Sequence, residues 1–225
     1  MARHHRSRGL SLIELLVGSA IGLVVVAAAG SVVAAQHHAA RRVQLEARLM
    51  QDLRGAAELV ARDLRRAGHW AGAASGVRHG DDPGAANPYA EIAPASASAS
   101  AVALSFASGG GGDPMVVADA ERFGFRLRNG ALEVQLGARN WQALSDLGTV
   151  VVTAFDVAPT VAEVDLSTFC EKPCAAGSTT CPPRQQIRTF SISLAGRSPV
   201  DPQVTRALRS NVRVRNDVVV GACDA

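Results

Sequence analysis

Aromatic residues are scarce in this 225-residue chain, and histidine is absent after His79. With aromatics at 4% of the sequence, a core has to be filled mainly by Val, Leu, Ala and Ile, which favours a modest β-rich domain over a large enzyme. The region after His79 lacks the usual general base of Ser-His-Asp and Cys-His catalysis. No Gly-x-Ser-x-Gly, phosphate-loop or His-Glu-x-x-His motif occurs in the sequence. We therefore expect no enzymatic activity.

Regular metal-ligand spacing is missing as well. Asp81, Asp82 and Asp113 are candidates for a calcium loop, but they lack the alternating oxygen-ligand spacing of such loops. We expect no metal site and no cofactor.

The formal net charge of +3 does not indicate a nucleic-acid-binding protein. Arg3, Arg6 and Arg8 account for the whole excess, so the chain after these residues is neutral. Binding to phosphates requires a concentrated basic surface. We therefore expect no nucleic-acid partner.

An apolar segment near the N-terminus predicts a membrane helix. Residues 15–35 carry no charge, and about 20 such residues span the hydrocarbon core of a bilayer. Basic residues precede this segment, so the positive-inside rule places the C-terminal region in the periplasm. Glu14 lies at the start of the apolar segment, where a carboxylate is costly unless it is paired or close to the headgroups, and this makes it a functional candidate. Gly18 and Gly22 form a small-xxx-small face that permits close helix packing.

The helix is predicted to continue beyond the membrane. Residues 36–67 contain no proline, and apolar residues recur there at the three-to-four spacing of one helical face. Glu58 and Arg62 are spaced for a supporting ion pair. Gly68 is expected to end the helix.

A β-rich domain is expected after the helix. Asn129-Gly130 between two alternating segments predicts a hairpin, and residues 149–157 are expected to form a central strand. Val212 and Val214 should face one way and Arg213 and Arg215 the other. The arginines then form either the solvent-exposed face of a sheet or a surface that docks a partner. The predicted strands are residues 101–106, 115–118, 122–128, 131–136, 149–157, 186–194 and 205–216.

The cysteines are confined to the C-terminal quarter of the chain. An even number in a periplasmic domain predicts two disulfides, and a zinc site is the alternative, although paired Cys-x2-Cys knuckles are absent. The sequence does not choose among the three possible pairings. The four residues are Cys170, Cys174, Cys181 and Cys223.

The N-terminus combines a short basic leader ending in Gly9, the apolar Leu10, and Glu14 as the fifth residue of the remainder. These features together resemble the type IV prepilin family. The resemblance implies cleavage by prepilin peptidase between Gly9 and Leu10, methylation of the new amine, and a role for Glu14 in setting subunit register. Many members have Phe after the cut, so Leu10 is a departure. The alternatives are that Gly9 is only a flexible residue before an anchor, and that Glu14 snorkels to the headgroups.

Two further phrases narrow the resemblance to minor pilins of the PilW type. The phrase Arg-Asp-Leu-Arg-Arg-Ala-Gly-His-Trp-Ala-Gly at residues 62–72 is similar to the segment that closes the long helix in those proteins. Val-Arg-Asn at residues 214–216 adds a weaker likeness. The alternative for the first phrase is an ordinary glycine-capped helix end with Trp70 packed under the domain.

The resemblance implies a pilin-like α+β fold, with a long N-terminal α-helix packed on an antiparallel β-sheet domain. It divides the chain into a leader (residues 1–9), a transmembrane or filament-core half-helix (10–35), an amphipathic half-helix (36–67) and a periplasmic β-rich domain (68–225). The expected location is the inner membrane, and then the pilus, of a Gram-negative bacterium. The expected partners are prepilin peptidase, other minor pilins and the major pilin, the inner-membrane assembly platform and lipid, and possible tip adhesins.

Three other functions stay open at this stage. The nearest is a J-type minor pseudopilin of type II secretion, which shares the N-terminal features and would have genes for secretion components as neighbours. A DNA-uptake pilin would retain DNA in a salt-dependent manner. A tethered periplasmic hydrolase would show turnover. Whether the pilus would serve motility, adhesion or DNA uptake is not encoded in these patterns.

Overall fold

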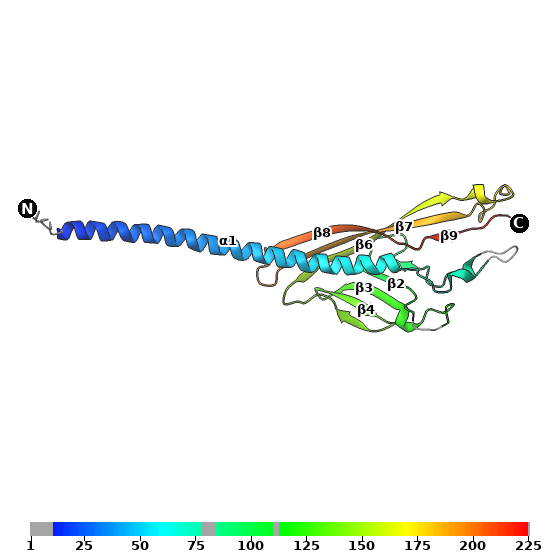
Figure 1. Cartoon of the computed structure of the whole chain (residues 1–225), viewed down its shortest axis with the longest axis horizontal. Helices are drawn as coiled ribbons and strands as arrows, with labels where there is room; N and C mark the ends of the chain where they lie inside the picture. Colours follow the sequence, from blue (N-terminus) through cyan, green and yellow to red (C-terminus); the bar gives the residue numbers. More distant parts are fainter. Residues whose placement is uncertain (1–10, 78–83, 110–112, 225) are drawn as a thin grey trace, which may run out of the picture. The chain divides into compact units, whose positions relative to one another are not determined.

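The computed structural model describes residues 11–77, 84–109 and 113–224, whose elements are traced in Figure 1. The chain divides into two units, Met1–Leu45 and Glu46–Ala225. The expected leader, with Gly9 and Leu10, lies outside the described residues, as do Asp81 and Asp82.

The predicted long helix is confirmed. Helix α1 runs over Leu12–Arg66, with Arg65 and Arg66 in its last turn, where cations suit the helix dipole. Gly68 follows with φ of +75°, a conformation that glycine adopts without strain. The expected ion pair between Glu58 and Arg62 does not form, because Arg62 Nε contacts the neighbouring Asp63 carboxylate at 3.2 Å.

The first sheet is antiparallel, with strand order β1-β2-β3-β4-β5. The predicted hairpin is confirmed between β3 and β4, and Asn129 (φ 51°) and Gly130 (φ 79°) both adopt the left-handed conformation that a two-residue turn requires. The strands are β1 (Ile92–Ala93), β2 (Ala101–Ser105), β3 (Arg122–Arg128), β4 (Ala131–Leu136) and β5 (Trp141–Ala143). Short 3₁₀ helices are η1 (Ala73–Gly76), η2 (Asp119–Glu121) and η3 (Ser167–Phe169).

The second sheet has the order β6-β7-β8, and β9 also pairs with β7. Its strands are β6 (Val151–Asp165), β7 (Arg184–Arg197), β8 (Thr205–Arg213) and β9 (Val218–Val220). The strand expected at residues 149–157 was wrongly taken as central: β6 lies at the edge of the sheet, and β7 is the central strand. An isolated bridge between Ala99 and Val157 links β6 to the segment before β2.

One other predicted strand is absent, and another is shorter than predicted. Residues 115–118 form no strand, because the Asp113 side chain and carbonyl accept the N–H groups of Met115 and Val116 and close a turn. The strand expected over 205–216 ends at Arg213, because the N–H of Arg215 leaves the sheet and donates to the carbonyl of Arg65 in α1.

The core of the second unit forms around the C-terminal part of α1. Figure 1 shows this part of the helix with β6, β7 and β8 on one side and β2, β3 and β4 on the other. The helix buries the face predicted from the apolar spacing, and the sheets contribute Phe125, Leu132, Phe190 and Ile192. The buried helix residues include Leu49, Leu53, Ala56, Val60 and Leu64. A long helix packed on antiparallel sheets confirms the predicted pilin-like α+β fold.

Candidate functional site

The first unit exposes an apolar helical surface. Residues 11–44 are all exposed, and Leu12, Leu23 and Val26 each leave more than two thirds of their surface uncovered. Within the described residues α1 alone is long and apolar enough to cross a membrane, judged by length and composition. Such a surface is unstable in water and requires lipid or other apolar helices as its environment.

Glu14 lies exposed in the first turn of α1. The Ser11 carbonyl accepts the N–H groups of Glu14 and Leu15 at 3.0 and 3.1 Å, which fixes the start of the helix. A carboxylate is favourable near a helix N-terminus, because the dipole there is positive. Glu14 is the one carboxylate in the apolar half of the helix, and among the described residues no basic side chain forms an ion pair with it.

Gly18 and Gly22 leave open space beside the apolar helix. A Cβ atom built at either position would meet no atom within 4 Å among the described residues. Packing inside this chain therefore gives no reason for glycine there. A neighbouring helix that approaches closely would give one.

The C-terminal end of α1 is held by side chains from two distant segments. Asn216 Nδ2 donates to the carbonyl of Ala67 at 2.9 Å, and Asn87 Nδ2 donates to that of Gly68 at 2.8 Å. These bonds satisfy carbonyls that a helix end leaves without partners. The two segments singled out in the sequence, residues 62–72 and 214–216, therefore meet in the structure.

Trp70 packs under the domain, as one sequence interpretation predicted. Its ring is buried, and Nε1 donates to the carbonyl of Pro114 at 2.6 Å. A Cβ at Gly72 would lie 2.8 Å from that nitrogen, so glycine is needed there. Residues 62–72 thus combine the capped end of a helix with a buried tryptophan that anchors the following loop.

The buried Tyr89 and the half-buried Glu121 form a polar contact beside Trp70. The Tyr89 hydroxyl donates to Glu121 Oε2 at 2.6 Å. Burial, together with this bond and the nearby carboxylate charge, raises the pKa of Tyr89 to about 12. The same hydrogen bond, helped by the N–H groups of Ser108 and Ala118, lowers the pKa of Glu121. The contact joins the loop after the helix to η2.

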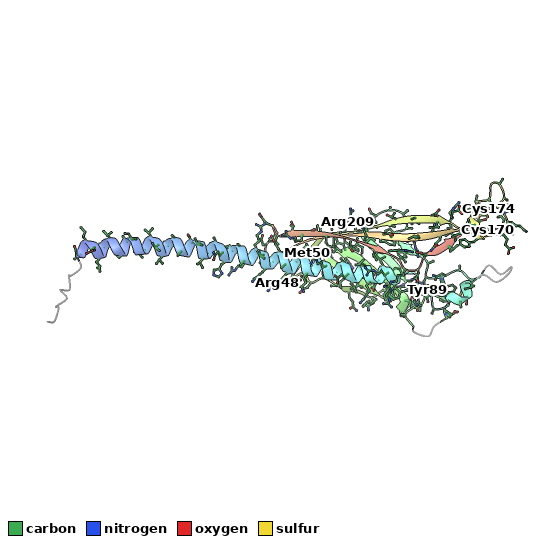
Figure 2. The ribbon with its side chains drawn as sticks, turned by 45° about the horizontal axis from the view of Figure 1, so that its top comes forward. Arg48, Met50, Tyr89, Cys170, Cys174 and Arg209 are labelled. Carbon is green, nitrogen blue, oxygen red and sulfur yellow. A yellow bond between two sulfur atoms is a disulfide. The ribbon has the colours of Figure 1, made fainter. Side chains whose placement is uncertain are left out.

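The cysteines form two disulfides at the tip of the β6–β7 hairpin, where Figure 2 labels Cys170 and Cys174. Cys170 pairs with Cys223, and Cys174 pairs with Cys181. The first bond fastens the C-terminal segment to the hairpin, and the second closes the loop on itself. Within the described residues no group of three or more His, Cys, Asp or Glu side chains is placed to hold a metal.

The arginine row near the C-terminus has the predicted alternation. Val212 and Val214 are buried, whereas Arg213 and Arg215 are exposed. Sequence reasoning missed the ion pair between Arg206 and Glu46, which joins β8 to α1. It also missed Arg188, a half-buried residue of β7 whose guanidinium donates to the Asn216 carbonyl at 3.0 Å. No local pattern marks these contacts, because their partners are far apart in the chain.

Two family models match the chain. Residues 42–214, more than half of the sequence, match the model described as prepilin peptidase-dependent protein B. Residues 4–30 match the prokaryotic N-terminal methylation motif, a range that includes Gly9, Leu10, Glu14, Gly18 and Gly22. No curated protein and no solved structure matches the chain.

Proposed function

The chain belongs to the family of prepilin peptidase-dependent protein B, and from this premise we propose that it is a minor pilin of the PilW type that takes part in type IV pilus assembly. The family is pilin-like and non-enzymatic, and membership implies processing by prepilin peptidase. The methylation motif and the apolar helix indicate anchoring of the prepilin in the inner membrane.

The proposed processing step is cleavage between Gly9 and Leu10, followed by methylation of the Leu10 amine. Cleavage removes Arg3, Arg6 and Arg8, which otherwise hold this end of the chain on the cytoplasmic side. The product is a neutral chain whose helix can leave the bilayer for an apolar filament core.

The observation that carries the proposal is the exposed apolar helix with one acid at its start. In lipid this helix is a membrane anchor, and among similar helices it becomes part of a filament core. Glu14 pairs with the N-terminal amine of a neighbouring subunit and so sets the register between them, because an isolated carboxylate in apolar surroundings is costly. Gly18 and Gly22 allow the close approach that such packing requires.

The proposed partners follow from this arrangement. The helix packs with other minor pilins and with the major pilin, and the inner-membrane assembly platform takes it from the membrane. The β domain, cross-linked by two disulfides, offers lateral surfaces within a small priming complex that ends at the pilus tip, with a tip adhesin as a further partner.

Asn216 and Asn87 hold the end of α1 through their bonds to Ala67 and Gly68, and this helix-end clamp supports the PilW type over a J-type pseudopilin. The two phrases that carry the PilW resemblance lie far apart in sequence, and Asn216 joins them by its bond to Ala67. Both segments contribute to the cap on α1. This shared role argues against the view that each resembles PilW-type proteins by chance.

The proposal is tested in the native host, in a strain that lacks the gene and is complemented with variants of the full chain. Mass spectrometry of the mature wild-type polypeptide should find methylated Leu10 as the first residue. Gly9→Phe should leave an uncleaved membrane precursor. Glu14→Ala should insert normally but be depleted from sheared pili, whereas Ser19→Ala, which removes a hydroxyl from the same apolar helix, should be incorporated like the wild type.

Other outcomes would contradict specific parts of the proposal. Normal processing of Gly9→Phe would disprove the leader assignment. Unchanged incorporation of Glu14→Ala would show that the charge has no role in assembly. Intact pili together with lost protein secretion in the deletion strain would assign the chain to a secretion system.

A further inference from the structure

Strand β8 ends its sheet with an edge that the rest of the described chain does not pair. It pairs with β7 along all nine of its residues, and in the part of the chain that the structure describes it has no neighbour on the other side. An edge strand presents a row of N–H and C=O groups to which an extended segment of another protein can add.

A groove runs along this edge between β8 and α1. Its first section has a volume of about 530 Å³ and lies between helix residues such as Met50 and Arg65 and strand residues such as Leu208 and Arg209. Figure 2 labels Met50 on the helix and Arg209 on the strand. A second section of about 420 Å³ also borders on Arg65 and extends the groove past residues 211–215.

Arginines line both walls of the groove. The helix contributes Arg54 and Arg65, the strand contributes Arg209, and Glu58 is the one acid that lines the first section. Arg213 and Arg215 continue the row along the second section. This concentration of positive charge stands out because the chain after the leader is neutral.

Several of these cations are not used inside the chain. Arg209 donates to Ser193 Oγ at 3.2 Å, and Arg213 pairs with Asp217 at 2.8 Å. Arg54, Arg65 and Arg215 form no ion pair with any described residue. Positive side chains on β8 would by themselves be explained as protection of this edge strand against pairing with the edge strand of another molecule. That explanation does not apply to Arg54 and Arg65, because they belong to α1.

We propose that this basic groove binds an extended, acidic segment of a partner protein. The segment adds to β8 as a further strand. Carboxylates on its side that faces α1 lie against Arg54 and Arg65, and a carboxylate on its opposite side lies against Arg209. Main-chain hydrogen bonds supply affinity, and the arginines select for acidic side chains. The groove is separate from the apolar helix. A failed binding test would therefore leave the proposals on processing and helix assembly unaffected.

The test uses the full chain in detergent micelles and a fluorescent peptide of about ten residues in which pairs of glutamates alternate with pairs of valine and threonine, so that both faces of the strand carry carboxylates. Fluorescence anisotropy should show saturable binding that weakens with added salt. The triple variant Arg54→Gln/Arg65→Gln/Arg209→Gln should bind about tenfold more weakly, since three exposed charge pairs each contribute modestly.

The matched control removes three exposed charges elsewhere, as Arg48→Gln/Arg128→Gln/Arg139→Gln, and should bind like the wild type. A second peptide, with alternate backbone amides methylated, keeps every carboxylate but cannot add as a strand, so it should not bind.

The proposal is overturned by any of four results: no binding of the acidic peptide, equal binding by the two triple variants, equal binding of the methylated peptide, or equally tight binding of single-stranded DNA. The last two results would mean that the groove attracts polyanions without strand addition.

Discussion

Removing the two disulfides one at a time should destabilise the β domain by unequal amounts. Cys170 and Cys223 are 53 positions apart in the sequence, whereas Cys174 and Cys181 are 7 apart. In the chain-entropy model a cross-link stabilises by restricting the unfolded chain, and the effect grows with the logarithm of loop length. The longer loop then corresponds to about 4 kcal/mol and the shorter one to about 2.5 kcal/mol.

The native contacts around the two disulfides also predict a larger loss of stability when the Cys170–Cys223 bond is removed. The Cys170–Cys223 bond holds the end of the chain, where Ala222 donates to the Thr180 carbonyl at 2.9 Å and Asp224 accepts from the Ala175 N–H at 2.6 Å. The other described contacts between these segments are few: the pairing of the three-residue strand β9 with β7 and the side-chain bonds from Ser178 to Asp224 and from Gln185 to Asp217. The Cys174–Cys181 bond lies within one loop. Its loss therefore does not release the C-terminal segment from the β6–β7 hairpin.

The assay is urea unfolding of the full chain in detergent, followed by the fluorescence of its two tryptophans, the buried Trp70 and Trp141 in β5. The variants are Cys170→Ser/Cys223→Ser and Cys174→Ser/Cys181→Ser. We expect the first to lose about 1.5 kcal/mol more free energy of unfolding than the second. Equal losses, or a larger loss for the second variant, would refute the loop-length argument for this hairpin.

Three further predictions concern the clamp, the buried tyrosine and the helix face. Asn216→Ala should lower the free energy of unfolding by about 1–2 kcal/mol in the same assay, because it leaves a helix-end carbonyl without its donor, whereas Asn140→Ala on an exposed loop should have no effect. Tyr89, whose pKa rises from 10.0 to about 12 on folding, contributes stability that is complete below pH 10 and lost as the pH rises through 12, so Tyr89→Phe should remove this alkaline loss from the pH profile of unfolding. Gly18→Leu should leave helix content by circular dichroism and membrane insertion unchanged but reduce incorporation into sheared pili, since only packing with other helices requires a small residue there.

Local patterns predicted the elements that are encoded locally. The apolar spacing of the helix and the Asn129-Gly130 turn depend on neighbouring residues alone, and both are confirmed. The extent of β6 was not visible in this way, because Pro159 interrupts its sequence pattern. An edge strand tolerates proline on its unpaired side, so the strand continues to Asp165.

The residues of the candidate site likewise divide into those marked by local sequence and those defined by long-range contacts. Glu14, Gly18 and Gly22 were found from the sequence because each is unusual for its own segment. The bond from Asn216 to Ala67 and the ion pair between Arg206 and Glu46 join residues about 150 positions apart or more, and spacing rules carry no signal for them.

These long-range contacts fasten β8 to α1 at both ends of the strand. Arg206 pairs with Glu46 near the start of β8, and the N–H of Arg215 donates to the Arg65 carbonyl just beyond its end. The two walls of the basic groove are therefore held at a fixed separation before any partner arrives. A preformed groove loses little conformational freedom on binding, so more of the interaction energy is available for affinity. A partner bound there would also be connected directly to the helix, whose other half is the part proposed to enter the filament core.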